Sequence, residues 1–364
     1  MKRNDFLLRA ATLLVAALAL TACSDEEDEP KVEPEVPETV DYANYAYIVN
    51  NGGWGMNNGT VSLLYANGTD ESSLTWGVTD LYQTANGYGI GDAQDLCLAE
   101  DKIFVTSTTS SKVEVLSTSG KLEQQFLLPG VQPRWIVNGG DGNVYFTTYS
   151  GYVYRMNAKT YAMDSVQVGS YPEALAVAEG SLYANISGYG TGSTVAKVDL
   201  TSFKKVKELD VVLNPYSQAI AVDGKVYFIS CGNYGSSYYG EPVYSTLQSI
   251  DAQTDKVSSL ANASVMAYDP TTKSLVCIYS DYYVSEKAAF RYDLSTGSQT
   301  SLPSLLEVEN AGQVSVDPRT GDIYVVSDDY MSPCQLTVFD KSGNLLRTIS
   351  GAGYSATKVV FTQE

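Results

Sequence analysis

A strand–turn–strand unit recurs along most of this chain, and the repetition limits the possible fold more than any other feature. It is clearest in "YPEALAVAEGSLYANI" from Tyr171, "YSQAIAVDGKVYFIS" from Tyr216 and "AGQVSVDPRTGDIYVVS" from Ala311. Each stretch has an apolar strand, a tight turn rich in Asp, Gly, Pro or Thr, and a β-branched or aromatic strand, and weaker strands follow. Short alternating strands separated by turn residues are typical of all-β proteins. No segment shows a convincing helical period.

The number of units follows from one position in the second strand of each. It recurs at intervals of about 40 to 50 residues, the length of a four-stranded propeller blade, at Phe104, Tyr145, Tyr183, Tyr227, Val276 and Tyr324. One more unit starts at Tyr45 without a first strand, and "YSATKVVFTQE" from Tyr354 supplies that pattern at the C-terminus. We therefore predict an all-β, seven-bladed β-propeller of four-stranded antiparallel blades, closed by the C-terminal strand joining the N-terminal blade.

The predicted blades cover 42–90 with 354–364, then 91–130, 131–170, 171–213, 214–261, 262–309 and 310–353. A pair of eight-stranded sandwiches is the structural alternative. The even repeat and the split first blade argue against it.

The first 41 residues do not share the repeat. Basic residues precede an apolar run and the "LTAC" that ends at Cys23, which is the pattern of a secretory signal. "LTAC" matches the bacterial lipobox, so we expect a lipoprotein signal peptide at 1–22 and lipidation of Cys23. Residues 24–41 contain nine acidic residues and one lysine, a composition that cannot form a core. We therefore expect a disordered acidic tether at 23–41 and the propeller at 42–364.

Composition argues against several classes of function. The chain has no histidine, so the commonest general base and the usual metal ligand are missing. A formal net charge of −19 argues against binding nucleic acid. We expect no cofactor, no metal and no catalysis, with a carboxylate-based hydrolase using Asp281, Asp328 and Asp329 as a minor alternative.

The remaining cysteines have no C-x-x-C spacing and lie in or beside apolar strand runs. We expect buried free thiols, with one disulfide as the alternative, at Cys97, Cys231, Cys277 and Cys334.

The loops that join strand two to strand three, and strand four to the next blade, emerge on one common face. They are rich in Tyr, Trp, Gly, Asn and Ser, as in "CGNYGSSYYGEPVY" from Cys231, whereas the turns on the other face are short. Tyrosine supplies flat apolar area and one hydroxyl at low conformational cost, as in antibody binding loops.

We therefore predict a ligand-binding face with these contact residues: Trp54, Tyr88, Asp95, Arg134, Trp135, Tyr149, Tyr171, Tyr189, Tyr216, Tyr234, Tyr238, Tyr239, Tyr282, Tyr330 and Tyr354. Tyr283 belongs to the same group of loop aromatics. Residues that enter the first strands should ring the central channel on this face: Gln94, Asp95, Arg134, Glu173 and Gln218. The tyrosines at 145, 183, 227 and 324 are instead expected to be strand formers whose hydroxyls reach solvent.

The units read roughly G-x-x-P-x-x-x-A-V-x-x-D-G-x-x-Y-V and resemble those of YncE-like propellers over nearly all of 42–364. "CSDEEDE" also looks like the acidic export signal of surface lipoproteins of Bacteroidetes, although a plain solvated linker would read similarly. With the lipobox and the Tyr/Asn/Gly loops, the chain most resembles the BtuG-type lipoproteins of gut Bacteroidetes.

That resemblance implies a non-enzymatic lipoprotein at the cell surface, held to the outer membrane through its lipid anchor alone. Such a protein captures cobalamin (vitamin B12) and passes it to a TonB-dependent outer-membrane transporter. Two alternatives stay open: a carbohydrate-binding surface lipoprotein of a glycan-uptake system, and a protein-interaction propeller that docks a transporter.

Overall fold

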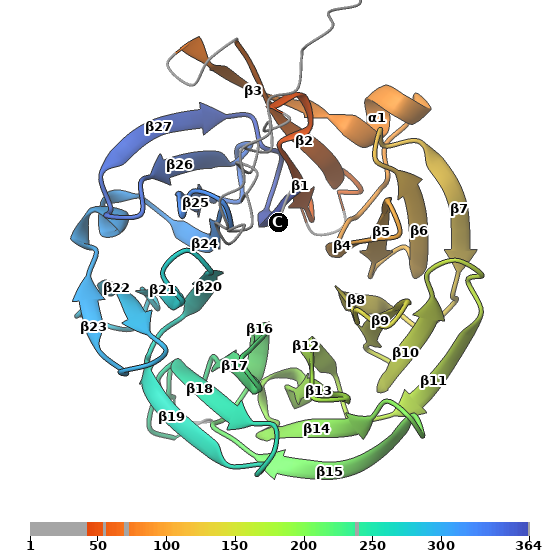
Figure 1. The fold of residues 1–364 in the computed structure, drawn as a ribbon, viewed down its shortest axis with the longest axis vertical. Coiled ribbons are helices and arrows are strands. Elements are labelled where there is room, and N and C mark those ends of the chain that lie inside the picture. Colours follow the sequence, from red (N-terminus) through yellow and green to blue (C-terminus); the bar gives the residue numbers. More distant parts are fainter. Residues whose placement is uncertain (1–41, 54–55, 69–72, 237–239, 363–364) are drawn as a thin grey trace, which may run out of the picture. The chain divides into compact units, whose positions relative to one another are not determined.

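The computed structural model describes residues 42–53, 56–68, 73–236 and 240–362, and these form seven four-stranded antiparallel sheets (Figure 1). The sheets are arranged as blades around a central axis, with the innermost strand of each blade beside that axis. The predicted seven-bladed propeller is confirmed.

Both ends of the propeller contribute to blade 1, which contains β28 (Ala356–Phe361), β1 (Ala46–Asn50), β2 (Thr60–Asn67) and β3 (Thr75–Asp80), from inside to outside. β28 pairs antiparallel with β1, from Ala46 opposite Phe361 to Asn50 opposite Ala356. The predicted closure by the C-terminal strand is therefore confirmed.

The other six blades are each built from four consecutive strands. Blade 2 contains β4 (Asp95–Ala99), β5 (Lys102–Ser107), β6 (Lys112–Ser117) and β7 (Leu122–Leu127); blade 3 contains β8 (Pro133–Asn138), β9 (Asn143–Thr148), β10 (Tyr152–Asn157) and β11 (Met163–Gln167). Blade 4 contains β12 (Pro172–Ala178), β13 (Ser181–Ile186), β14 (Thr194–Asp199) and β15 (Lys204–Asp210); blade 5 contains β16 (Pro215–Val222), β17 (Lys225–Ser230), β18 (Thr246–Asp251) and β19 (Val257–Asn262). Blade 6 contains β20 (Val265–Asp269), β21 (Ser274–Tyr279), β22 (Ala288–Asp293) and β23 (Gln299–Ser301); blade 7 contains β24 (Ala311–Val316), β25 (Ile323–Ser327), β26 (Gln335–Phe339) and β27 (Leu345–Ser350).

A short helix, α1 (Leu81–Asn86), lies between β3 and β4, where no helical period is visible in the sequence. Asp80 caps its start by accepting a hydrogen bond from the Gln83 backbone N–H at 2.9 Å, and Gly87 ends it in the left-handed conformation. Six residues held by two caps are too few to produce a periodic pattern. Short 3-10 turns occur at Tyr42–Asn44, Gly188–Gly190 and Pro303–Glu307. Within the described ranges, no helix is long and apolar enough to cross a membrane.

The second strands form the centre of each blade. The repeated position is almost fully buried at all six sites identified in the sequence. The expectation that its tyrosine hydroxyls reach solvent is therefore wrong. Tyr145 donates to Asp141 at 2.7 Å, and Tyr183 donates to the backbone oxygen of Ala252 at 3.4 Å. The packing of neighbouring blades covers these hydroxyls, and a single sheet would not.

The described cysteines are free, and Cys97, Cys277 and Cys334 are buried while Cys231 is half-buried. Burial raises the pKa of Cys231 and of Cys334 to about 11. Since the thiolate is the reactive form, we expect these four thiols to resist Ellman's reagent at neutral pH in the folded protein. All four should react once the protein is unfolded in guanidinium. Rapid reaction of the folded protein, or fewer than four new thiols on unfolding, would contradict this.

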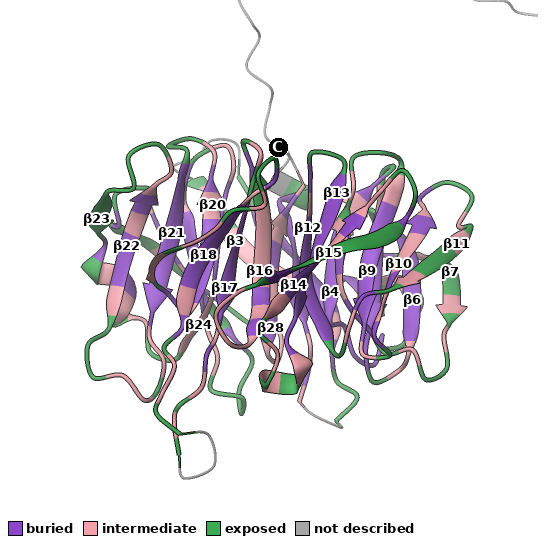
Figure 2. Ribbon diagram, turned by 90° about the horizontal axis from the view of Figure 1, so that it is seen from below, coloured by how far each residue is buried: buried purple, intermediate pink, exposed green. Residues whose placement is uncertain are grey.

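The connections between strands separate onto two faces of the ring. We call the face with the second-to-third-strand loops and the inter-blade loops the loop face, and the opposite one the turn face. Figure 2 shows the longer loops of the loop face below and the compact turns above. Tyr45, just before β1, lies at the turn face, where its backbone N–H donates to Leu64 and its carbonyl accepts from Thr362.

Candidate functional site

Three neighbouring blades begin on the loop face with the same local structure. Their inner strands β8, β12 and β16 each start at a proline, and a shift of register follows it directly. The residue before each proline has positive φ: Gln132 (54°), Tyr171 (49°) and Asn214 (59°). A bulge changes the direction in which the neighbouring side chains point. The three shifts bring three equivalent residues together at the mouth of the central channel: Arg134, Glu173 and Tyr216.

Arg134 is the centre of a buried polar network at this mouth. Its Nε and Nη2 atoms lie 3.0 and 2.8 Å from Oε2 of Glu173, and Nη2 also donates to the Tyr216 hydroxyl at 3.0 Å. Nη1 donates to Oε1 of Gln94. The indole N–H of Trp135 donates to Glu173 at 3.0 Å. The network joins blades 2 to 5 and holds the mouth in one geometry.

Burial sets the electrostatics of this pair, because Arg134 is 6% exposed and Glu173 only 1%. Burial raises the pKa of Glu173, and the attraction of Arg134 opposes that rise. Burial would lower the pKa of Arg134, but the attraction of Glu173 and of nearby tyrosines outweighs it, so the pKa lies above its usual value. The pair is neutral as a whole and already hydrogen-bonded. Arg134 therefore positions the groups around it instead of offering a free charge.

Three tyrosines continue from Arg134 toward solvent, and we call Tyr149, Tyr171 and Tyr189 the aromatic row. The guanidinium lies 4.5 Å from the ring centre of Tyr149. Ring centres are then 5.1 Å apart from Tyr149 to Tyr171 and 5.2 Å from Tyr171 to Tyr189. Exposure rises along the row to 75% at Tyr189. The row presents rigid aromatic area that begins at the channel mouth and ends in solvent.

The loop face has a neutral half and an acidic half. The loop segments of blades 2 to 4, which carry the aromatic row, contain no charged residue over 108–111, 128–132, 149–151, 168–171, 187–193 and 211–214. Most acidic residues of this face lie on the loops of blades 5 to 7, at Glu241, Asp281, Glu286, Glu307, Glu309, Asp328 and Asp329. Two carboxylates border the neutral half: Asp92, which is 8% exposed and accepts backbone N–H groups of Thr109 and Ser110, and Asp210 at the end of β15. The neutral half suits a ligand without net charge.

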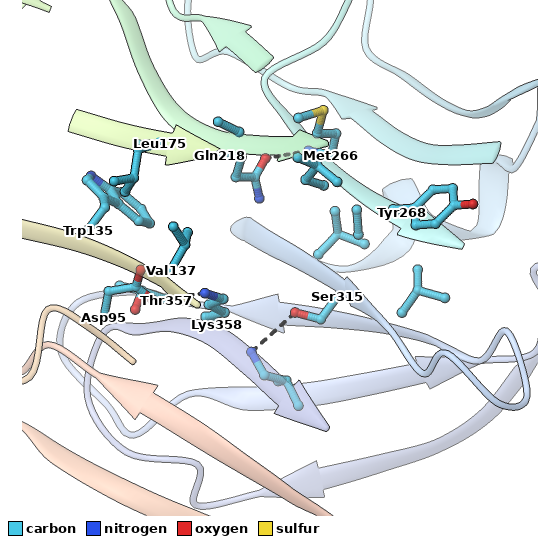
Figure 3. Close-up of a pocket in the computed structure, with 17 residues that line it drawn as sticks. Asp95, Trp135, Val137, Leu175, Gln218, Met266, Tyr268, Ser315, Thr357 and Lys358 are labelled. Atoms are coloured by element: carbon cyan, nitrogen blue, oxygen red, sulfur yellow. Dashed lines mark hydrogen bonds and ion pairs between the residues drawn. The ribbon is translucent and has the colours of Figure 1, made fainter. Parts of the chain in front are cut away.

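Below the mouth, the inner strands enclose a cavity of about 280 Å³. Figure 3 shows its lining, where Trp135 lies across the cavity from Tyr268 and Asp95 lies near Lys358. Gln218 donates to Gln313 at 3.1 Å and accepts from the Met266 backbone N–H at 2.6 Å. The residues expected to ring the channel therefore do so, either at the mouth or in the lining.

A second group of aromatic side chains lies on the acidic half. The ring centres of Tyr234 and Tyr282 are 6.0 Å apart, and Tyr283 lies 5.3 Å from Tyr282 and 6.2 Å from Tyr244. Tyr282 is 80% exposed. These contacts join the loops of blades 5 and 6, away from the aromatic row.

The remaining predicted contact residues are not brought into either group. The ring of Tyr88 packs on Tyr82 of α1 at 5.8 Å. Tyr330 is 77% exposed, and Tyr354 accepts a backbone hydrogen bond from Gly52. Trp54, Tyr238, Tyr239 and Cys23 lie outside the described residues.

The carboxylates considered for catalysis make local hydrogen bonds. Asp281 accepts from the Ser264 hydroxyl at 2.7 Å. Asp328 and Asp329 accept backbone N–H groups of their own turn, from Tyr330 and Met331 at 2.8 Å each. Among the residues that the structure covers, no cluster of three or more metal-binding side chains occurs.

The sequence predicts Glu173 and Gln94 only as residues that ring the channel, and their joining with Arg134 in one network is visible only in the structure. The repeated proline carries the signal, because Pro133, Pro172 and Pro215 precede Arg134, Glu173 and Tyr216 at equivalent positions. Equivalent positions in adjacent blades lie at the same height around the axis. Tyr244 of the second aromatic group is the last residue of the Tyr-rich loop 231–244, but it was not named among the predicted contact residues.

No family model and no curated protein matches this sequence. Among solved structures, a putative 6-phosphogluconolactonase from Bacteroides fragilis is similar with a TM-score of 0.62 and 13% identity, over 90% of this chain and 100% of that one. The WD40 propeller domain of Doa1 is similar with a TM-score of 0.52 and 15% identity, over 90% of this chain and 91% of that one. Virginiamycin B lyase from Staphylococcus aureus is similar with a TM-score of 0.52 and 10% identity, over 70% of this chain and 83% of that one. At these identities the likeness shows the propeller fold alone, and this fold hosts ligand binding, protein interaction and catalysis.

Proposed function

We propose that this protein is a non-enzymatic capture protein that binds a broad, uncharged ligand on the neutral half of its loop face. The single observation that carries the proposal is the aromatic row, which runs from the buried Arg134 to the exposed Tyr189 in unbroken ring contact. A rigid scaffold that projects aromatic rings from its loops is the usual design of a binding face.

The ligand that we propose first is a corrinoid, the ligand class of the lipoproteins that this sequence resembles. A corrin is a broad plate rimmed with amides, so it can lie against tyrosine rings and accept or donate hydrogen bonds at their hydroxyls. Because the chain has no histidine, an imidazole of this protein cannot bind the cobalt. A titration with cyanocobalamin, followed by calorimetry and by the visible spectrum of the corrin, tests this choice directly.

Truncating the aromatic row should weaken binding strongly. Stacking on one aromatic ring contributes roughly 1–3 kcal/mol, which is about fivefold to a hundredfold in affinity. We therefore expect Tyr171→Ala and Tyr189→Ala each to raise the dissociation constant for cyanocobalamin about tenfold, and Tyr189→Phe to retain most of the affinity. Tyr244→Ala, also a half-exposed loop tyrosine but on the acidic half, should leave it unchanged.

Two results would favour the alternatives. Absence of corrinoid binding at micromolar concentration, together with a positive glycan array, would indicate a carbohydrate-binding protein. Absence of both, together with co-purification of a transporter that survives the aromatic-row substitutions, would indicate a docking propeller.

We also propose that the protein is a lipoprotein of the outer-membrane surface and delivers its ligand to a TonB-dependent transporter. The propeller supports this arrangement, because its first strand begins on the turn face, opposite the aromatic row. Metabolic labelling with an alkyne-tagged fatty acid should label the wild type and not Cys23→Ser, and intact cells of the wild type should be accessible to an antibody.

A further inference from the structure

The cavity beneath the channel mouth has the composition of a binding site for a small amphiphile. Its volume of about 280 Å³ is that of roughly nine water molecules in liquid water. Most of its lining is apolar: Val137, Ala174, Leu175, Ala219, Ile220, Met266, Ala267, Val314, Val316 and Val359. Water in such a space finds few hydrogen-bond partners, so an apolar group gains by displacing it.

One cation interrupts the apolar lining. Lys358 enters the cavity from β28 and stands beside Asp95 (Figure 3). Its Nζ donates to Asp95 Oδ1 at 3.1 Å and to the Leu96 carbonyl at 3.3 Å. An ammonium has three donors, so one N–H of Lys358 is left for a ligand. The Lys358 side chain is 37% exposed to solvent.

Asp95 holds that lysine in place without competing for the third donor. The carboxylate is 2% exposed and also accepts the backbone N–H groups of Leu96 at 2.8 Å and Ile136 at 3.0 Å. Each of its oxygens is therefore bound to the protein.

Two residues of the cavity lining also belong to the mouth. Trp135 lines the cavity and donates to Glu173 of the mouth at 3.0 Å. Gln218 likewise belongs to both the lining and the ring of residues around the mouth.

We propose that this cavity, which we call the channel site, binds a slim aliphatic group that ends in a hydrogen-bond acceptor, with the acceptor on Lys358 and the aliphatic part among the inner strands. A short-chain carboxylate has this chemistry. The proposal goes beyond capture on the loop face and does not depend on it, because none of the aromatic row lines the cavity.

The test is calorimetric titration of the full chain with a series of straight-chain carboxylates from butanoate to octanoate. Octylammonium, which carries a positive charge on a chain of the same length as octanoate, is the control ligand. Affinity should rise roughly three- to fourfold for each added methylene, the factor expected for burial of apolar area. Octanoate should bind at least tenfold more tightly than octylammonium.

Two variants locate the site. Ala219→Phe should weaken octanoate binding at least tenfold, because Ala219 is half-buried on the cavity wall and a larger side chain fills the cavity. Lys358→Met should remove the preference for carboxylate over ammonium. Val206→Phe, an equivalent enlargement on the outermost strand of blade 4 where Val206 is 57% exposed, should change neither, and melting curves check that all three variants are folded.

A brominated octanoate should also quench the fluorescence of Trp135, and Trp135→Phe should lose that quenching. No octanoate binding at millimolar concentration, no dependence on chain length, or equal binding to Ala219→Phe would overturn the proposal. Loss of octanoate binding in Ala219→Phe with unchanged cobalamin binding would separate the channel site from the aromatic row.

Discussion

A chain that stops after Gly353 is expected not to form a stable propeller. It would lack β28, the inner strand of blade 1, whose residues Ala356, Val359 and Phe361 are buried. Burying Val359 and Phe361 contributes about 1.5–3 kcal/mol each, and every backbone hydrogen bond to β1 adds about 1 kcal/mol. The sum is on the order of 5–10 kcal/mol, which is comparable to the whole stability of a typical domain.

Loss of β28 would also weaken the contact between blade 1 and blade 7. The ring of Phe361 lies 5.2 Å from Tyr324 of blade 7 and 5.8 Å from Tyr45, and the Val359 N–H donates to Ser315 of β24 at 3.2 Å. The free edge of β1 would then be open to pairing with another chain.

We therefore expect the truncated chain to aggregate, or to show no cooperative melting by circular dichroism. A chain that stops after Thr362 keeps β28 and is the matched control, with a melting temperature equal to the wild type. Phe361→Ala should fall between the two, with a loss of about 3 kcal/mol. Cooperative melting of the shorter chain near the wild-type temperature would show that the ring does not need this closure.

The second large effect is expected for Arg134→Met, which leaves Glu173 buried without its cation. Breaking a buried ion pair by removing one partner typically costs about 3–5 kcal/mol. Glu173→Gln should cost a similar amount, since Arg134 then remains charged and unpaired. The double variant should lose less than the two single losses added together, because it leaves no unpaired charge.

The loss of unfolding free energy in Arg134→Met should depend on pH, and the direction of the Glu173 pKa shift determines its sign. Burial already raises the pKa of Glu173 in the folded protein above its unfolded value, and removing Arg134 removes the attraction that opposes that rise. Charged Glu173 therefore destabilises the folded variant above its folded pKa. As the pH falls through that pKa the carboxyl takes up a proton, and the deficit relative to the wild type shrinks.

The free energy of unfolding of Glu173→Gln should itself lack this pH dependence, because glutamine does not titrate and Arg134 stays charged throughout. Denaturant unfolding of the three variants between pH 4 and 8, fitted for the free energy of unfolding, makes the comparison. Equal losses at both pH limits for Arg134→Met would contradict the buried-pair account.

The architecture could be predicted from the sequence because it repeats. A position such as Tyr183 is buried in every blade, so its recurrence reveals both the number of blades and the missing strand that β28 supplies. α1 could not be predicted, because the caps at Asp80 and Gly87 stabilise a helix too short to show a period.

For the candidate site, the sequence predicts only which face of the ring carries the aromatic loops, and not which side chains contact one another. Loop order placed Tyr149, Tyr171 and Tyr189 on one side of the ring, and their ring contacts depend on backbone features that no pattern shows. Tyr171 and Tyr189 both have positive φ, at 49° and 56°, a conformation uncommon for bulky residues. The tyrosines beyond the aromatic row, such as Tyr88, have the same composition and a different environment, which residue type alone cannot distinguish.

Hydrogen–deuterium exchange with and without saturating cyanocobalamin tests the central claim most directly. Ligand capture on the neutral half of the loop face predicts slower exchange in 149–151, 168–171 and 187–193, and unchanged exchange in the short turns of the opposite face. Protection confined to the turn face, or binding that leaves all three of these loops unprotected, would contradict it.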